Sequence, residues 1–346
     1  ASGDPLPNSV VLWTRLAIDP LNGGGMPPEN IIVRWSVAVD EHMTKIVRSG
    51  QTLATPELAH SVHVDVRGLE PERWYWYQFR VGKEVSPIGR TRTAPARNSS
   101  IPQLNFAFAS CQDWQNGYYT AYKHMAEEEL DLVVHLGDYI YEYEAQPDKL
   151  RQHIGSEIFT LEDYRNRHAQ YKTDPNLQAV HSKFPWIVTW DDHEVENNYA
   201  GLIPEENQSQ EEFVTRRAYA YQAYYEHMPL RRFSLPKGPD MQLYRRFTFG
   251  DLAEFNVLDT RQYRTDQPCD DGLKPRCSQA LAEEATMTGQ KQEQWLLKGL
   301  DKSSARWNVI AQQTMFAEYD FDPRPETGLF NVDQWDGYVA ARNRIL

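Results

Sequence analysis

Three apolar segments of this sequence each run into side chains that can bind metal ions. Short, continuously apolar runs are typical of buried strands in a parallel sheet, and ligands bind beyond the carboxyl ends of such strands. Thiolate, carboxylate, imidazole, amide and phenolate groups are all ordinary metal ligands. The apolar segments and the residues that follow them are 104–109 with Cys111, 132–136 with Asp138 and Tyr141, and 184–190 with Asp191, Asp192, His193, Asn197 and Asn198.

The three aspartates argue for a bound cation. If the strands are neighbours, Asp138, Asp191 and Asp192 lie close together, and two like charges about 4 Å apart cost about 4 kcal/mol at an effective dielectric constant of about 20. Bound cations convert that repulsion into binding. Taken singly, Cys111 could be a small buried side chain and His193 a packed structural histidine. Their combination at three strand ends favours a metal site.

Strands alternate with helices over residues 98–346, which predicts an α/β domain. Continuous apolar strands between helices indicate a sheet that is covered on both faces. We expect further strands at 252–258 and 307–311 and helices at 119–129, 211–227 and 290–299, the last ending at Gly299.

The first part of the chain has a different pattern. Residues 1–97 contain short runs of alternating polarity without helical periodicity, which predicts an antiparallel β-sandwich. Tyr75 follows Leu69-Glu70-Pro71 in a pattern that resembles the tyrosine corner of fibronectin type III domains. We expect this domain to be a packing module that carries no catalytic residues. The expected strands are 9–16, 31–39, 63–66, 74–81 and 88–93.

Composition excludes several kinds of partner. The 346 residues carry 36 Lys and Arg against 49 Asp and Glu, a net charge of −13. This balance argues against nucleic-acid recognition and against an anionic membrane surface. No apolar run approaches the length of a membrane span.

Cysteine usage points to an oxidising compartment. Cys269 and Cys277 flank a stretch rich in Pro, Gly and Asp, which favours an irregular loop closed by a disulfide over two free thiols. Cys111 is then the odd cysteine.

Seven motifs in order resemble the PhoD-type alkaline phosphatases, within the metallophosphoesterase superfamily. The resemblance covers essentially the whole chain. It implies a fibronectin-III-like β-sandwich at 1–97, followed at 98–346 by a four-layer α/β/β/α metallophosphoesterase domain. The motifs are ASGDPLPNSVVLWTRL, FAFASCQ, HLGDYIYEY, WDDHEVENNYAG, LDTRQYR, NVIAQQTMFA and WDGY.

The resemblance also implies an activity. We expect a metal-activated hydroxide to hydrolyse phosphomonoesters and phosphodiesters at alkaline pH, with iron(III) and calcium as cofactors. Family members scavenge phosphate during starvation and are exported through the twin-arginine route. We therefore expect a periplasmic or secreted protein whose partner is a phosphoester substrate, with no protein partner.

The resemblance assigns metal ligands by position. Cys111, Asp138 and Tyr141 match the iron ligands, and Asp138 would bridge to calcium. Either Asp192 or the pair 197–198 would supply the remaining calcium ligands, and the sequence leaves open which asparagine takes part.

Two further residues are candidates for catalysis. His193 matches the histidine near substrate, where it could protonate the leaving group or orient the phosphate. Arg261 in the LDTRQYR segment suits a phosphate clamp, although a structural salt bridge explains it equally well.

One feature departs from the family pattern. No histidine follows His227, whereas PhoD-type enzymes carry a late GD-x-H motif. We therefore expect the catalytic domain to be incomplete at its C-terminus.

Two alternative functions are weaker. A purple-acid-phosphatase-like enzyme would have an aspartate in place of Cys111. A non-catalytic binding protein on a degenerate phosphatase fold would have no need for so many clustered carboxylates.

Overall fold

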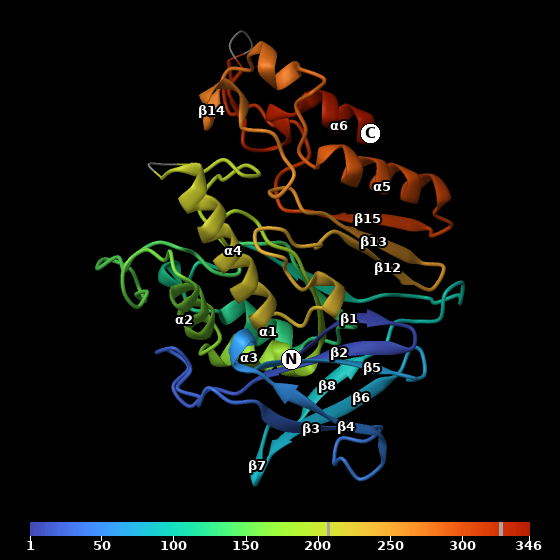
Figure 1. Ribbon diagram of the computed structural model, residues 1–346. Helices are drawn as coiled ribbons and strands as arrows, with labels where there is room; N and C mark the ends of the chain where they lie inside the picture. Colours follow the sequence, from blue (N-terminus) through green and yellow to red (C-terminus); the bar gives the residue numbers. More distant parts are fainter. Residues whose placement is uncertain (206–207, 325–327) are drawn as a thin grey trace.

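The computed structural model describes residues 1–205, 208–324 and 328–346, and has a mixed α/β fold with several sheets (Figure 1). Its central sheet has six strands, and β1 pairs in parallel with β11, so strands from the first part of the chain extend the sheet that carries the candidate site. In spatial order the strands are β5 (Ser61–Arg67), β2 (Ser9–Arg15), β1 (Ser2–Leu6), β11 (Pro185–Val188), β10 (Leu132–His135) and β9 (Phe106–Ala109).

A second sheet packs against the strands that the N-terminal part of the chain contributes to the central sheet. Val10 and Leu12 of β2 pack with Val33 and Val37 of this second sheet in one apolar core. The Tyr75 hydroxyl accepts the Glu70 backbone N–H at 2.8 Å, which is the contact expected of a tyrosine corner. The strands of the sheet are β4 (Ile46–Ala54), β3 (Ile31–Ala38), β6 (Trp74–Val81), β7 (Glu84–Val85) and β8 (Gly89–Arg92).

Four helices pack on one face of the central sheet (Figure 1). Their core is strongly aromatic, and Trp190 stacks on Tyr221 with ring centroids 4.0 Å apart. Two of the helices start at capping boxes formed by Thr160 and by Ser209, which satisfy backbone donors at the first turn. The helices are α1 (Thr120–Glu127), α2 (Leu161–Tyr171), α3 (Pro175–Lys183) and α4 (Gln210–His227).

A three-stranded sheet packs on the other face. Val134 and Ile187 of the central sheet share a core with Phe247 and Phe255 of this sheet, and α5 (Gly289–Lys302) lies on its outer side (Figure 1). The strands are β12 (Arg245–Phe249), β13 (Ala253–Val257) and β15 (Trp307–Ala311).

The expected end of α5 at Gly299 is wrong. The helix continues to Lys302. Gly299 faces the sheet, where a Cβ atom would collide with the guanidinium group of Arg246. The glycine therefore provides space for packing rather than a helix stop.

The expectation of strands covered on both faces holds for two of the three site strands. All residues of β10 and β11 are buried. β9 instead forms an edge of the central sheet, and Phe108 is 67% exposed.

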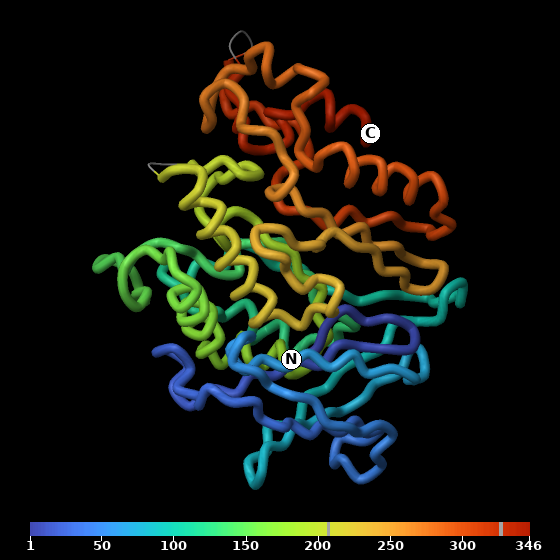
Figure 2. The backbone as a smooth tube through the Cα atoms, viewed as in Figure 1, coloured from blue at the N-terminus to red at the C-terminus, as the bar shows by residue number. Residues whose placement is uncertain are grey.

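The C-terminal part of the chain lies at the end of the molecule opposite the N-terminal strands (Figure 2). It contains the Cys269–Cys277 disulfide, which confirms that prediction. Its elements are β14 (Leu273–Lys274), β16 (Phe330–Asn331) and α6 (Val339–Ile345). The short 3₁₀ helices among the described residues are η1 (Pro56–Leu58), η2 (Trp114–Asn116), η3 (Arg232–Ser234), η4 (Pro268–Asp270), η5 (Ser278–Leu281) and η6 (Trp335–Gly337).

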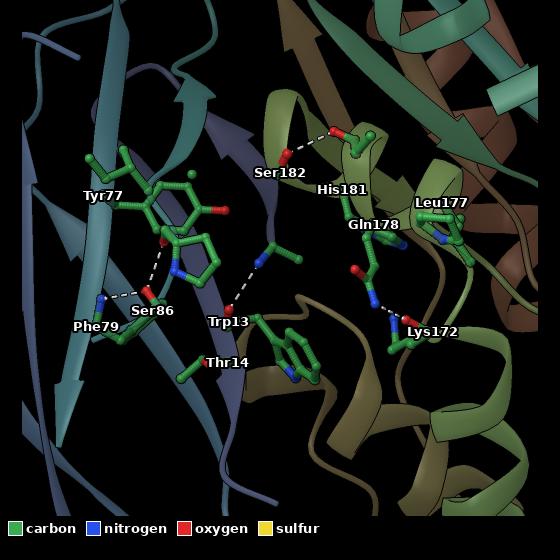
Figure 3. A pocket seen from close by; sticks show the side chains of 16 residues that line it. Trp13, Thr14, Tyr77, Phe79, Ser86, Lys172, Leu177, Gln178, His181 and Ser182 are labelled. Atoms are coloured by element: carbon green, nitrogen blue, oxygen red, sulfur yellow. Dashed lines mark hydrogen bonds between the residues drawn. The ribbon is translucent and has the colours of Figure 1, made fainter. Parts of the chain in front are cut away.

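A cavity of about 540 Å³ lies where the N-terminal strands meet α3 (Figure 3). Trp13, Tyr77, Lys172 and His181 are among its lining residues, and none of the strand-end aspartates lines it. The candidate chemistry lies instead at the carboxyl ends of β9, β10 and β11. No helix in the described ranges is long and apolar enough to cross a membrane.

Candidate metal centre

The three strand ends meet at one edge of the central sheet. β10 lies between β9 and β11 and runs parallel to both. Backbone hydrogen bonds continue beyond the strands, where the Cys111 N–H donates to the Gly137 carbonyl and the Gln112 N–H donates to the Asp138 carbonyl, each at 3.1 Å. The loops after β9 and β10 therefore stay paired as far as the polar residues.

Asp138, Asp192 and His193 form the centre of the cluster. One ligand atom from each lies within 4.8 Å of the other two. Asp138 and Asp192 are buried and His193 is half-buried. This spacing is suitable for one cation or for a pair of cations sharing a carboxylate.

The backbone at Asp138 has an uncommon conformation. Gly137 and Asp138 have φ angles of 112° and 55°. A Cβ atom on Gly137 would collide with the backbone nitrogen of Asp191, so only glycine allows the loops after β10 and β11 to approach this closely. The close approach brings Asp138 to the residues that follow β11.

Glu194, which was not among the residues predicted from the sequence, links these two loops by hydrogen bonds. Its buried carboxylate accepts the N–H of Asp138 at 3.0 Å, the N–H of Asp191 at 2.8 Å and the N–H of Tyr139. Burial raises its pKa to about 7 against the opposing effect of these hydrogen bonds. Its place inside the DDHE motif was the only available signal.

Cys111 and Tyr141 also interact with Asp138. The Tyr141 hydroxyl donates to Asp138 Oδ2 at 3.2 Å, and the Cys111 thiol interacts with the same carboxylate. Partial burial, followed by the charge of Asp138, raises the pKa of Cys111 to about 12, although the residue as a whole is exposed, and raises the pKa of Tyr141 above its usual range. A bound cation would favour the deprotonated forms of both groups.

His193 is held by two neighbours. Its Nδ1 atom lies 2.8 Å from Glu142 Oε2, and its ring stacks on Tyr141 with centroids 4.2 Å apart. Burial opposes the charged form, yet Asp192 and Glu142 together raise the pKa of His193 well above its ordinary value. Glu142 is a second residue that the sequence analysis missed.

The two asparagines have different surroundings. The Asn197 N–H donates to Glu142 Oε1 at 2.7 Å. The Asn198 N–H donates to Asp192 Oδ2 at 2.8 Å, and its Nδ2 donates to Asp271 Oδ2 at 2.6 Å. Asn198 therefore has the direct connection to the central cluster.

Arg261 is 1% exposed and is surrounded by carboxylates. Its guanidinium contacts Asp191 at 2.6 Å, Asp333 at 2.8 Å and Asp192 at 3.5 Å. Burial opposes its charge, but these three carboxylates raise its pKa well above the usual value. The contacts are those of a structural ion-pair network, and a role as a phosphate clamp stays a prediction.

The donor set fits bound metal. Asp138 Oδ1 is buried and has no hydrogen-bond partner among the described residues. Burial first, and then the charges of Asp192 and Asp191, raise the pKa of Asp138 well above its ordinary value, so a free carboxylate there lacks compensation. Thiolate, phenolate and carboxylate groups suit a trivalent iron, while carboxylate and amide oxygens suit calcium.

Comparison with known proteins decides the family. Residues 106–346 match the PhoD-like phosphatases, and residues 1–95 match the N-terminal domain of PhoD-like phosphatases. The chain belongs to the PhoD-like phosphatase family. This confirms the resemblance seen in the sequence motifs.

Two relatives are similar over the whole chain. Alkaline phosphatase D of Bacillus subtilis (strain 168) is 60% identical over 351 residues, which cover 100% of this chain and 60% of the relative. A solved structure described as that of PhoD has a TM-score of 0.98 and 60% identity, covering 100% of this chain and 67% of that one. The chain therefore spans about three fifths of the length of the Bacillus phosphatase.

Proposed function

We propose that this PhoD-like chain carries a metal-dependent active site that hydrolyses phosphomonoesters and phosphodiesters at alkaline pH. The observation that carries the proposal is the convergence of Cys111, Tyr141, Asp192 and His193 on Asp138 at three adjacent strand ends. The 60% sequence identity of the chain to an alkaline phosphatase supports the same reaction.

We assign the iron(III) side of the site to Cys111, Asp138 and Tyr141. The calcium side takes Asp138 and Asp192, with Asn198 preferred over Asn197 because its backbone already binds Asp192. When bound, the metals supply positive charge that activates water as the nucleophile and stabilises the phosphoryl oxygens.

The protein residues orient and protonate the substrate. Glu142 fixes the ring of His193 at Nδ1, which leaves Nε2 to donate a proton to the leaving oxygen or to hold a phosphoryl oxygen. Arg261 is proposed to keep Asp191 and Asp192 from repelling each other, because its guanidinium already contacts both.

The proposal also covers the architecture of the two domains and the compartment in which the protein acts. The packing of helices, two facing sheets and α5 supports a four-layer α/β/β/α metallophosphoesterase domain, and the Tyr75 corner supports a fibronectin-III-like N-terminal sandwich. The Cys269–Cys277 disulfide supports a periplasmic or secreted site of action, where the enzyme would scavenge phosphate.

The test is Asp138→Asn in the full-length protein. Asparagine tolerates the positive φ angle of this position, so the fold should persist. We expect loss of bound metal and of phosphoester hydrolysis, measured by elemental analysis and with a chromogenic monoester and diester. Near-normal turnover would refute the metal assignment.

A further inference from the structure

The disulfide loop reaches the candidate metal centre through one side chain. Asp271 lies two residues after Cys269, and its Oδ2 accepts the hydrogen bond from Asn198 Nδ2 at 2.6 Å. The Asn198 backbone N–H in turn donates to Asp192 Oδ2 at 2.8 Å. Asn198 therefore links the loop to the central cluster, its side chain binding Asp271 and its backbone binding Asp192.

The contact with Asp271 fixes the orientation of the Asn198 side chain. A carboxamide has a donor nitrogen and an acceptor oxygen that exchange places when it flips, and only the oxygen binds calcium. A carboxylate accepts hydrogen bonds but donates none, so Asp271 holds the nitrogen of Asn198 on its own side. The Asn198 oxygen is then directed away from Asp271. Gln267 fixes the backbone as well, because its Nε2 donates to the Asn198 carbonyl.

The loop holds Asp271 in a conformation that flexible chain rarely adopts. Cys269, Asp270 and Asp271 have φ angles of 60°, 60° and 55°. Positive φ is unfavourable at a residue other than glycine, so three in succession need external restraint. The disulfide closes this loop with Cα atoms 5.7 Å apart.

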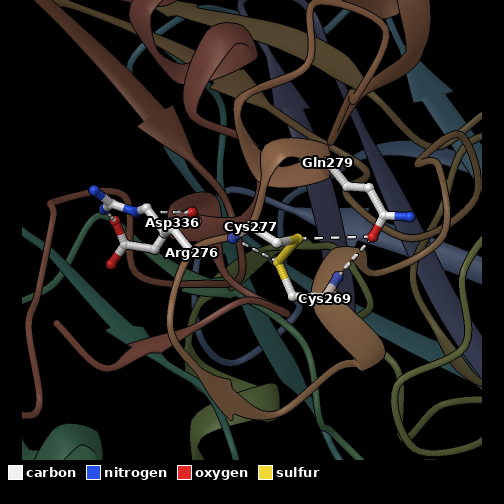
Figure 4. Close-up of a disulfide and its surroundings, with 5 residues drawn as sticks. All are labelled: Cys269, Arg276, Cys277, Gln279 and Asp336. Atoms are coloured by element: carbon white, nitrogen blue, oxygen red, sulfur yellow. Dashed lines mark hydrogen bonds and ion pairs between the residues drawn. A yellow bond between two sulfur atoms is a disulfide. The ribbon is translucent and has the colours of Figure 1, made fainter. Parts of the chain in front are cut away.

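Neighbouring contacts support the disulfide (Figure 4). The Cys269 N–H donates to Gln279 Oε1 at 3.1 Å, and Arg276 forms an ion pair with Asp336. The second carboxylate oxygen of Asp271, Oδ1, is buried and has no hydrogen-bond partner among the described residues. The loop thus presents a restrained carboxylate with one free oxygen beside Asn198.

We propose that Asp271, held in place by the Cys269–Cys277 disulfide, is a positioning residue that orients the Asn198 carboxamide for calcium. This inference rests on the proposed function, because it concerns the calcium side of the same site. It assigns the disulfide a role in metal affinity in addition to any role in stability.

The test compares two neighbouring aspartates by calorimetric titration of the full-length protein with calcium ions. Asp271→Gly removes the carboxylate at a φ angle that glycine favours. Asp270→Gly is the matched control, because Asp270 has the same sign of φ but is exposed. We expect Asp271→Gly to weaken calcium binding about 10- to 100-fold, as for other residues that orient a metal ligand, and Asp270→Gly to leave it unchanged.

Two further variants separate orientation from charge and from folding. Asp271→Asn keeps an oxygen that can accept from Asn198, so we expect it to restore most of the affinity lost in Asp271→Gly. The double variant Cys269→Ser/Cys277→Ser should weaken calcium binding in the same direction while Cys111 stays intact.

The outcomes are distinct. If Asp271→Gly binds calcium as tightly as the wild type while Asp138→Asn does not bind it, the positioning role is wrong and the metal site stands. If Asp271→Asn weakens binding as much as Asp271→Gly, charge rather than orientation is responsible and the inference is overturned. If the wild-type protein binds no calcium, the proposed calcium site fails together with the inference.

Discussion

The carboxylate of Glu194 accepts the backbone N–H of Asp138 at 3.0 Å and so joins the strand ends of β10 and β11 through a side chain that is fully buried. The same carboxylate binds the N–H of Asp191 at 2.8 Å. The position of Asp138 at the cluster therefore depends on an acceptor that does not belong to the metal-binding set. Glu194 differs in this respect from Asp192 of the same motif, which the proposed site uses as a calcium ligand.

Glu194→Gln should destabilise the protein. The amide nitrogen would replace one acceptor oxygen with a donor that faces backbone N–H groups, and an unsatisfied buried donor costs about 1–3 kcal/mol. We expect a loss of this size in the free energy of unfolding, measured with urea, and weaker metal binding. Glu127→Gln on the exposed face of α1 is the control and should change stability by less than about 0.5 kcal/mol. An unchanged midpoint for Glu194→Gln would contradict this role.

Cys111→Ser should lower iron content without a large change in folding. Cys111 is exposed as a whole residue, so its replacement by serine removes little packing, whereas a hydroxyl is a poorer ligand than a thiolate for a metal that accepts sulfur. Elemental analysis and the visible absorption spectrum of the full-length protein would report the loss. Iron at the wild-type stoichiometry in the variant would show that the thiolate is not a ligand.

The sequence predicts the parts of the fold that depend on local patterns. The runs around β10 and β11 are apolar on both faces, and the structure confirms them as buried strands. The disulfide was also predictable, because Cys269 and Cys277 are eight residues apart in a turn-rich stretch. These features need only short-range information.

Elements that depend on distant partners were missed. β1 contains Gly3, Asp4 and Pro5, which are poor strand formers. The buried Asp4 is compensated by Arg245, which lies 2.8 Å away but 241 residues later in the sequence. α2 is mostly polar in sequence, and it starts at a cap on Thr160.

Within the candidate site, ligand types could be predicted but their support could not. The strand-end motifs indicate Asp138 and Asp192, because each lies two residues after the end of an apolar run. The contacts of Asn198 with Asp271 and of Arg261 with Asp333 join segments about 70 residues apart. No spacing within one motif reports such contacts.

The Arg261→Gln variant distinguishes the two roles that the sequence allows for Arg261, a phosphate clamp and a structural salt bridge. Its removal would leave the buried Asp191 without its ion-pair partner and Asp333 with Arg264 alone, and breaking a buried ion pair in this way costs about 3–5 kcal/mol. We therefore expect a large loss of stability, measured by chemical unfolding. A phosphate clamp predicts a different result: a raised KM in a variant whose unfolding midpoint is unchanged.

His153 should make the protein less stable in acid. Burial, and then the positive charge of Arg167, lowers the pKa of His153 to about 3 from a usual value of 6.5. Its Nδ1 lies 2.7 Å from the Tyr143 carbonyl and its Nε2 lies 3.0 Å from the Tyr171 hydroxyl, so a neutral ring satisfies both contacts. Between pH 6.5 and 3 the unfolded chain binds a proton here that the folded chain does not.

The free energy of unfolding therefore falls as pH decreases through this window, by about 1.4 kcal/mol per pH unit from this group. Between pH 7 and pH 5 the wild type should lose roughly 2 kcal/mol more than His153→Gln, because glutamine does not titrate. Urea unfolding at the two pH values measures the difference. His124→Gln, at an exposed position on α1, should behave as the wild type does. Equal losses in the wild type and His153→Gln would show that His153 is not the group that links acid to unfolding.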